Sequence, residues 1–418
     1  MARLREQLID HSLHLHGAVG TVPSLRTPSG MLKATPAQVR NIHLLSLLMA
    51  RDGKVETARL LIEAALRMAP GDPRLVFHAA RIFEETDSPT QATGYYQRSL
   101  ALDPRNQHTR FHMALNLLGM GRLAEGAALY ASRPTALHAN TSIRRLPRWD
   151  GTPRDGRVLL WAEQGVGDEI MFLRFLSVIP ELHGMLVVEV DRRLRPLYER
   201  NFPQVCFQDR GTPFRAKDYC AQAAIGDLLC LFHARMGQPG FAAHALSAPA
   251  GDRAARRPVR LGASVRKKII GISWLTMSQV HALERSIAID EFLQAFDPDR
   301  HALVNLQYLA PPEDLDHIRQ RGFELLVTPG LDCHQDLCGL AALISELDQV
   351  VCIDNSTAHL AGSVGQDVLV LLPRLANWRW PEGDKPTLWY PRVTTVRQQE
   401  ARNWQQVLWE VRSRLSGH

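Results

Sequence analysis

The sequence predicts an all-α repeat array followed by two Rossmann-like α/β lobes. Three observations support this fold class: a 34-residue period in the first third, a break rich in arginine, proline and glycine after it, and then short apolar runs that alternate with helical stretches. A chain of 418 residues is long enough for about two to four domains. The composition, 45% hydrophobic and 22% charged, is typical of a folded protein.

The 34-residue period defines the first domain. Pro70 and Pro104 lie 34 residues apart, and four further sets of positions keep the same step. These sets are Gly53, Asp87 and Gly121; Ala58, Ala92 and Gly126; Ile62, Tyr96 and Tyr130; and Ala65 and Ser99. They place a turn residue between two helices, small residues where the helices touch, large residues where neighbouring repeats stack, and proline after the second helix.

Residues 39–130 therefore resemble tetratricopeptide repeats, two of them complete and a third that weakens after Tyr130. An irregular helical bundle with accidental periodicity is the alternative. Because about three repeats are needed to bury a continuous core, we expect the last repeat to pack against the next domain. We assign the array to residues 37–135. Residues 1–36, rich in proline and glycine, should be loosely ordered apart from a short helix near residues 4–15.

Residues 136–156, rich in arginine, proline and glycine, mark the first domain boundary. After them, the apolar runs RVLLWA, MLVVEV, KIIGISW, HALVNLQY, QVVCID and DVLVLLP alternate with helical stretches. This alternation predicts parallel sheets with crossover helices. A second linker, 246–266, divides the region into a first lobe, 157–245, and a second lobe, 267–418. Ligands of such sheets bind beyond the carboxyl ends of the strands.

The sequence contains no signal for export or for a membrane. It has no run of ~18 uncharged apolar residues, and its N-terminus lacks the apolar stretch of a secretory signal, so we expect a cytoplasmic protein without a membrane span. The six cysteines are irregularly spaced without a C-x-x-C pair, which indicates reduced thiols. A zinc site on Cys333, His334 and Cys338 would lack a second ligand pair, and we expect no metal site.

The net charge of +6 is modest for this length. Basic residues concentrate between residues 253 and 268, beside Pro258 and Gly262 and without interleaved aromatic residues. Such a run is typical of a solvated linker, and we expect no nucleic-acid partner. A mildly basic cleft for a phosphorylated ligand would explain the positive charge equally well.

The candidate catalytic loop of the first lobe follows its first predicted strand. Gly165 and Gly167 permit a tight turn into a helix and a close approach of the backbone to a ligand. The dinucleotide fingerprint G-x-G-x-x-G is incomplete, since Ile170 stands where its third glycine would be. Asp168 begins the helix, where a carboxylate either caps the helix or takes a proton from an attacking hydroxyl; Glu163 is the alternative base.

The second lobe carries the segment DNSTAHLAG after a predicted strand. A helix that begins there would present free backbone N–H groups and its positive dipole end to a diphosphate. The candidate diphosphate-binding residues are Asn355, Ser356, Thr357, Ala358, His359 and Arg285. His359 would add a hydrogen bond or a charge, and Arg285 a bidentate clamp. Ordinary N-capping by Asn355 or Ser356 is the alternative.

Further residues should line a nucleotide or sugar pocket. They are Gly165, Gly167, Ser273, Trp274, Asp354 and Trp378. Trp378 belongs to one of two aromatic groups near the C-terminus, on which sugars and bases stack, although packing between lobes explains such groups equally well.

Taken together, EQGVGDEI, GISW with Arg285-Ser286, DNSTAHLAG and NWRW with LWYP resemble tetratricopeptide-linked glycosyltransferases related to the heptosyltransferases, glycosyltransferase family 9, of GT-B fold. The resemblance covers about residues 39–418. The loop after Trp274 departs from it, since it lacks the glycine that relatives often carry.

The resemblance implies an inverting, metal-independent transfer that needs no cofactor beyond the nucleotide-sugar substrate. The first lobe would bind the acceptor, with Asp168 as base, and the second lobe would bind the donor through Ser356, Thr357 and His359. A C-terminal helix, near residues 403–415, would return to the first lobe. Some relatives with a repeat array glycosylate flagellin, which makes an acceptor protein held by the array the expected partner.

Two other functions stay open at this stage. The acceptor could be lipopolysaccharide core or another glycan, although a repeat array has no evident role in binding such an acceptor. Alternatively, the chain could be a non-catalytic scaffold whose transferase region has decayed. The presence of Asp168, Arg285 and His359 argues against decay.

Overall fold

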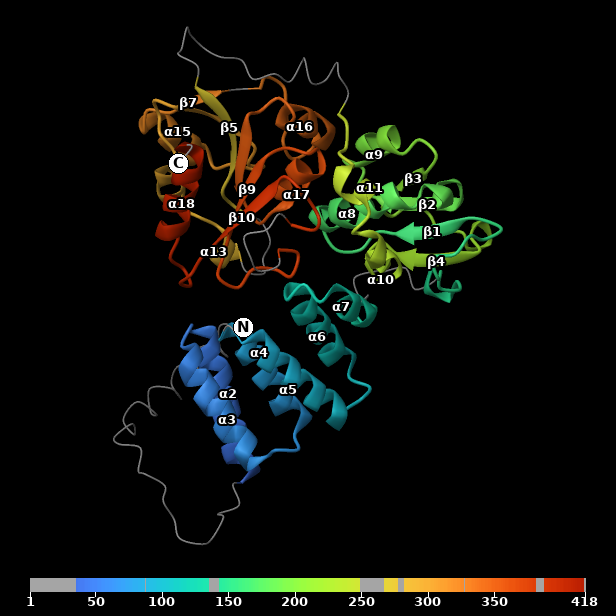
Figure 1. The fold of residues 1–418 in the computed structure, drawn as a ribbon, viewed down its shortest axis with the longest axis vertical. Coiled ribbons are helices and arrows are strands. Elements are labelled where there is room, and N and C mark those ends of the chain that lie inside the picture. The colour runs from blue at the N-terminus through green and yellow to red at the C-terminus, as the bar shows by residue number, and fades with distance from the viewer. Residues whose placement is uncertain are drawn as a thin grey trace.

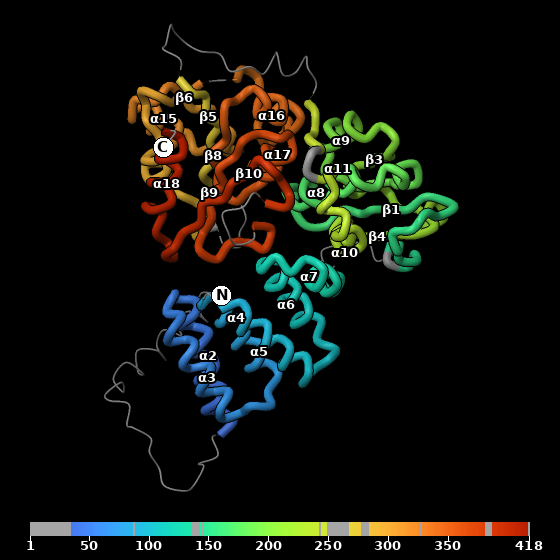
Figure 2. Tube along the Cα trace, viewed as in Figure 1, coloured from blue at the N-terminus to red at the C-terminus, as the bar shows by residue number. Residues whose placement is uncertain are grey.

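The computed structural model describes residues 35–86, 88–134, 143–248, 267–276, 282–326, 328–380 and 387–416. The expected loose segment and short helix before residue 35 and nearly all of the interlobe linker therefore lie outside the described residues. The described chain forms a helical array below two α/β lobes (Figures 1 and 2).

The array consists of three helix pairs. The helices are α2 (Pro36–Arg51), α3 (Val55–Met68), α4 (Pro73–Glu85), α5 (Pro89–Leu102), α6 (Gln107–Gly119) and α7 (Leu123–Tyr130). Ala58 and Ala92 are fully buried, and a Cβ on Gly126 would lie 2.6 Å from Leu118 Cγ, so the small positions do lie where the helices touch. The tetratricopeptide-like array predicted from the period is thus confirmed.

The first lobe holds a four-stranded parallel sheet in the order β3-β2-β1-β4. Its strands are β1 (Val158–Trp161), β2 (Leu186–Val190), β3 (Cys206–Asp209) and β4 (Ala221–Ala224). Its helices are α8 (Val166–Leu173), α9 (Arg195–Asn201), α10 (Asp227–Phe232) and α11 (Pro239–Ala243), with 3-10 turns η2 (Arg174–Val178), η3 (Pro180–Met185), η4 (Ala216–Asp218) and η5 (His233–Arg235). In register, Val158 faces Leu186 on one side and Ala221 on the other.

The end of the expected linker belongs to this lobe. After η1 (Ile143–Arg145), the chain runs along β4, where Trp149 N donates to Gln222 O at 2.8 Å and Gln222 N donates to Pro147 O at 2.9 Å. These bonds cover part of the outer edge of β4, so the described residues from 143 onward pack on the first lobe.

The second lobe holds a six-stranded parallel sheet in the order β10-β9-β8-β5-β6-β7. Its strands are β5 (Lys268–Ser273), β6 (His301–Asn305), β7 (Glu324–Leu326), β8 (Gln349–Ile353), β9 (Val368–Leu372) and β10 (Val393–Arg397). Its helices are α13 (Ala282–Arg285), α14 (Ile289–Phe292), η6 (Leu293–Ala295), α15 (Pro312–Gln320), α16 (Leu337–Ile344), α17 (Ser356–Ser363) and α18 (Gln405–Ser416). This is the strand order of a Rossmann sheet, with its switch point between β5 and β8.

The C-terminal helix α18 does not return to the first lobe. It packs against η6 and β10, and Arg412 donates to Gln294 O at 3.3 Å. Its buried residues Val407, Leu408 and Val411 join a core cluster of the second lobe. Figure 1 shows α18 on the side of that lobe away from the first. The return expected from the resemblance is therefore wrong, because the apolar face of α18 is already covered by its own lobe.

One hydrophobic core joins the last repeat to both lobes. It includes Ala127 and Tyr130 of α7, Phe172 of α8, and Trp380 and Tyr390 from the second lobe. This confirms that the third repeat packs against the next domain. None of the helices in the described part of the chain combines the length and the hydrophobicity of a membrane span.

Candidate active site

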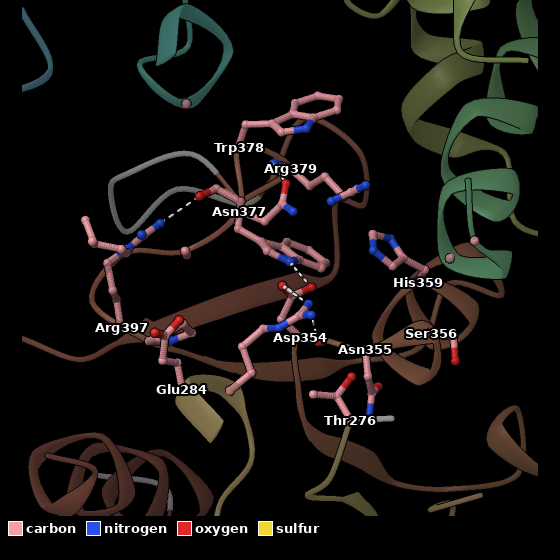
Figure 3. A pocket seen from close by; sticks show the side chains of 18 of the residues that line it. Thr276, Glu284, Asp354, Asn355, Ser356, His359, Asn377, Trp378, Arg379 and Arg397 are labelled. Atoms are coloured by element: carbon pink, nitrogen blue, oxygen red, sulfur yellow. Dashed lines mark hydrogen bonds and ion pairs between the residues drawn. The ribbon is translucent and has the colours of Figure 1, made fainter. Parts of the chain in front are cut away.

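A cleft of about 1100 Å³ lies where the repeat array and the two lobes meet. The array contributes residues such as Arg81, Glu84 and Leu115, and the first lobe contributes Gly165 to Asp168. The second lobe contributes residues that follow β8 and β9, together with others such as Glu284 and Arg397 (Figure 3). The cleft therefore lies beyond the carboxyl ends of parallel strands, beside the switch points of both sheets, where open α/β folds bind ligands.

Asp168 lies in the first turn of α8 and faces across the cleft. Its Oδ2 accepts a hydrogen bond from Gly165 N at 3.2 Å, the geometry of a helix cap. Its Oδ1 pairs with the guanidinium of Arg379, which belongs to the loop after β9 of the second lobe. Both side chains are largely buried, with 15% and 14% exposed. One carboxylate thus caps α8 with one oxygen and faces the second lobe with the other.

Gly167 lets α8 approach α17 across the boundary between the lobes. A Cβ at this position would lie 2.9 Å from Cδ2 of His359 and 3.6 Å from Cα of Ser356. The close backbone approach expected from the sequence is therefore found, but it is an approach to another helix. Gly167 brings Asp168 to the start of α17.

Asn355 caps the start of α17, where the sequence predicts a diphosphate site. Its Oδ1 accepts from Thr357 N at 3.0 Å and from Ala358 N at 3.4 Å. Its Nδ2 donates to Ser273 Oγ at 2.8 Å and to Leu275 O at 3.2 Å. Two backbone N–H groups predicted to be free are thus capped by the chain itself, as the alternative interpretation held. Ser356, partly exposed at the cleft, is the residue of this turn that a ligand reaches most directly.

His359 is buried beside the cleft and uncharged. Its ring stacks on Trp380 with the ring centroids 5.1 Å apart, and its Nδ1 lies 3.0 Å from Tyr390 Oη. Burial lowers its pKa to about 4, and the positive charge of Arg379 acts in the same direction. At neutral pH the imidazole can offer a hydrogen bond but not the positive charge that the sequence interpretation allowed.

Asp354 organises the second-lobe side of the cleft. Its Oδ1 accepts from Trp380 Nε1 at 2.7 Å, and its Oδ2 lies 3.2 Å from Nη1 of Arg285. Figure 3 labels Asp354 and draws its contacts as dashed lines. The structure thus brings together two predicted residues, Asp354 and Arg285, with an aromatic residue of the loop after β9.

Two predicted pocket residues, Ser273 and Trp274, lie behind the cleft wall. Both are fully buried. Ser273 Oγ donates to Gln307 Oε1 at 2.9 Å, and Trp274 Nε1 donates to Asp314 Oδ2 at 2.7 Å. Neither lines the cleft, because both side chains are turned to buried partners, Gln307 and Asp314. Ser273 supports the site indirectly, by holding Asn355.

Glu163 is a structural carboxylate. Its Oε1 accepts from Arg133 Nη2 at 2.6 Å and from Gly226 N at 3.0 Å, and its side chain is 4% exposed. It is not among the residues that line the cleft. The suggestion that Glu163 could replace Asp168 as a base therefore finds no geometric support.

Trp378 lies at the junction with the array. Its ring centroid is 5.4 Å from that of Tyr130 and 6.3 Å from that of Phe172. It also lines the cleft, so it combines the two roles that the sequence left open, packing between domains and contact with a ligand.

The sequence interpretation missed the arginines of the cleft apart from Arg285. The arginines in its lining are Arg51, Arg81, Arg193, Arg285, Arg374, Arg379, Arg397 and Arg402, and the carboxylates are Glu84, Glu85, Asp168, Glu284 and Asp354. Arginines outnumber carboxylates, which gives the cleft the basic character that the net charge suggested. Arg379 stands between the two tryptophans of NWRW, a segment noted only for its aromatic residues.

Comparisons with known proteins give one relative in sequence. No family model matches the chain. The chain is 30% identical over 331 residues to Protein FlbA of Caulobacter vibrioides. This chain is similar to FlbA. The match covers 73% of this chain and 54% of FlbA, so the chain spans about half the length of the curated relative it matches.

Solved structures resemble separate parts of the chain. A glycosyl transferase family 9 structure from Veillonella parvula covers 64% of this chain and 97% of its own, at 12% identity and a TM-score of 0.40. The type III secretion chaperone SycD of Yersinia enterocolitica, in complex with a peptide of the translocator YopD, covers 26% of this chain and 84% of its own, at 18% identity and a TM-score of 0.24. Both TM-scores are low, and the fold rests on the helices and strands described above.

Proposed function

We propose that this chain is an inverting glycosyltransferase that moves a sugar from a nucleotide-sugar donor to a hydroxyl group of an acceptor protein such as flagellin. The acceptor oxygen would attack the anomeric carbon, the bond from that carbon to the phosphate oxygen would break, and its electron pair would leave with the nucleoside diphosphate. The proton of the acceptor hydroxyl would pass to Asp168.

The observation that carries this proposal is that Asp168 of the first lobe and the N-terminus of α17 of the second lobe lie next to each other and line the same cleft. A general base and an anion-binding region must flank the reacting carbon from two sides, and the cleft presents them from different lobes. The arginines of the lining supply the positive charge that a leaving diphosphate needs. We therefore propose a transfer that does not depend on a metal ion.

The array supports a protein acceptor. Arg81 and Glu84 of α4 and Leu115 of α6 line the same cleft as Asp168. A polypeptide bound along the array would thus pass directly into the cleft. A small glycan would not need the array helices at the entrance of the cleft for binding. Transfer to a glycan by a protein lacking its array would favour the alternative acceptor.

The test is a transfer assay with purified protein, candidate flagellin and a panel of nucleotide sugars, read by the mass shift of the acceptor and by release of nucleoside diphosphate. Transfer that persists in a metal chelator would support metal independence. A protein that gives neither mass shift nor nucleotide release with any pair would contradict the proposal.

Asp168→Asn should lower the rate of transfer by about 10²-fold or more, because an amide cannot accept the proton, while nucleotide binding persists. Asp155→Asn is the matched control, since Asp155 is exposed and does not line the cleft. Turnover of Asp168→Asn at the wild-type rate would remove Asp168 from the mechanism.

A further inference from the structure

Arg379 is the cleft arginine that contacts the candidate base. Its side chain reaches from the loop after β9 to α8 of the first lobe, and its guanidinium carbon lies 5.5 Å from the centre of the Trp378 ring. The loop is held in place by Arg397, whose Nη2 donates to the carbonyl oxygen of Trp380 at 2.6 Å. Arg379 is therefore a positioned side chain whose charge lies inside the cleft.

Arg379 pairs with Asp168, the carboxylate proposed as the base. Among the described residues, the ion pair of Arg379 is with Asp168, while Asp354 is engaged by Arg285 and by Trp380. Both carboxylate oxygens of Asp168 are already engaged, Oδ1 by Arg379 and Oδ2 by Gly165 N, so an acceptor hydroxyl would have to displace the guanidinium to reach Oδ1. Without ligand, the candidate base is thus restrained by the second lobe.

The start of α17 has limited capacity to bind a diphosphate with its backbone. Asn355 takes the N–H groups of Thr357 and Ala358, and His359 is uncharged at neutral pH. Side-chain cations must therefore contribute to anion binding. Gly167 places α8 against the start of α17, so Arg379, which pairs with Asp168 of α8, lies close to this helix end.

We infer that Arg379 is a ligand for the donor diphosphate, and that it exchanges Asp168 for phosphate when the donor binds. The inference rests on the proposed function and adds to it a coupling between donor binding and the release of Asp168. Entry of the diphosphate would draw the guanidinium away from Asp168 and leave that carboxylate to accept the acceptor proton. A base released only in the loaded cleft would restrict proton abstraction to the complex that holds a donor.

The exchange is tested by calorimetric titration of the full chain with ADP, GDP, UDP, dTDP and inorganic pyrophosphate. Arg379→Gln should weaken binding about 10- to 100-fold, because it removes a charged group that donates two parallel hydrogen bonds to phosphate. The affinity of Arg379→Lys should lie between those of Arg379→Gln and the wild type. Arg392→Gln is the control for a general loss of positive charge, since Arg392 also pairs with an aspartate, Asp367, but is exposed and does not line the cleft. Thermal unfolding of each variant checks that it is folded.

The decisive measurement is a double-mutant cycle with Asp168→Asn. If Asp168 competes with the ligand for Arg379, Asp168→Asn should tighten binding about 5-fold, since the arginine no longer has to be released. The same change made on Arg379→Gln should tighten binding less than about 2-fold, because the competition is already gone. Equal tightening in both backgrounds, or wild-type affinity in Arg379→Gln, would overturn the inference.

The two proposals fail in different ways. A wild-type protein that binds none of the probes would contradict the proposed donor class, and this inference with it. A wild-type protein that binds a probe, with Arg379→Gln binding equally well, would contradict only the role of Arg379.

Discussion

Arg133 shows how a single buried side chain joins the array to the first lobe. It follows α7, and its guanidinium contacts Glu163 at 2.6 Å and Asp227 at 2.8 Å, with 2% of its side chain exposed. Burial acts to lower the pKa of Arg133, but Asp227 and Glu163 together raise it above its ordinary value, so the guanidinium stays charged. Glu163 is thereby assigned to structure, which leaves Asp168 as the carboxylate of the cleft on this lobe.

Arg133→Met should reduce the free energy of unfolding by about 3–5 kcal/mol, because it removes the cation from the buried Glu163 and leaves Asp227 paired only with the exposed Arg148 among the described residues. Adding Glu163→Gln should restore part of that loss, since one of the two buried charges is then removed. Denaturant unfolding measures both effects.

The control is Arg148→Met. Arg148 also pairs with Asp227, at 3.1 Å, but 62% of its side chain is exposed, so its loss should cost less than about 1 kcal/mol. If Arg133→Met costs no more than Arg148→Met, the buried network does not hold the array on the lobe.

At the scale of elements, helices α2, α4 and α6 bring four histidines together. His43 Nε2 lies 2.8 Å from His78 Nδ1, and His108 and His112 lie 3.2 Å apart through their Nε2 atoms. Phe77 contacts the rings of His78, His108 and His112, with centroids 5.0 to 5.4 Å away. Burial lowers the pKa of His78 to about 4 and that of His112 to about 3, and neighbouring positive groups add to the shift. His78 and His112 therefore pack as uncharged rings at neutral pH.

The stability of the array should fall on acidification. The unfolded chain takes up protons on these histidines near pH 6.5, whereas folded His78 takes one up only near pH 4. Their contribution is thus fully present above about pH 6.5 and is lost as the pH falls towards 4. Around them, Asp72 favours protonation of His43, and Arg81 opposes protonation of His78 and His112.

Urea unfolding between pH 7.5 and 4.5 measures this dependence. His78→Gln combined with His112→Gln should give a shallower decline than the wild type. His317→Gln serves as control, because His317 lies on the second lobe and half of its side chain is exposed. Identical pH profiles of the wild type and the double variant would show that these histidines do not carry the effect.

At the scale of the whole molecule, the array shares a hydrophobic core with the two lobes. Tyr130 occupies the same repeat position as Ile62, but its ring lies 6.1 Å from that of Phe172 in the first lobe and 5.4 Å from that of Trp378 in the second. The third repeat thus shares the core of the two lobes, whereas the buried residues of the first repeat belong to a separate cluster with the second repeat.

Tyr130→Ala and Ile62→Ala should separate these roles. Each removes a buried side chain and should cost about 2–5 kcal/mol of stability where it packs. We expect Tyr130→Ala to raise hydrogen exchange in both α7 and α8 and to slow transfer. Ile62→Ala should raise exchange only in the first two repeats. Unchanged exchange of α8 in Tyr130→Ala would contradict the shared core.

Local patterns in the sequence determined the repeat array and most strands, since a period and an apolar run depend only on nearby residues. The six predicted apolar runs contain β1, β2, β5, β6, β8 and β9. Strand β4, Ala221–Ala224, carries no β-branched residue, and β7, Glu324–Leu326, has three residues, so neither gives a strong local signal. The turn before Asp168 and the segment around Asn355 could also be located, because each follows such a strand.

Only the tertiary structure decided what those residues contact. Asp168 and Arg379 are 211 positions apart in sequence, and the capped turn at Asn355, the burial of Trp274 and the placement of α18 all depend on side chains from distant segments. The packing of sheets and helices determines which residues of distant segments come into contact, and no local sequence pattern encodes that packing. The sequence alone therefore determined the fold class and the loops of the cleft, whereas the packing of the lobes decided that the candidate base is held by an arginine of the opposite lobe.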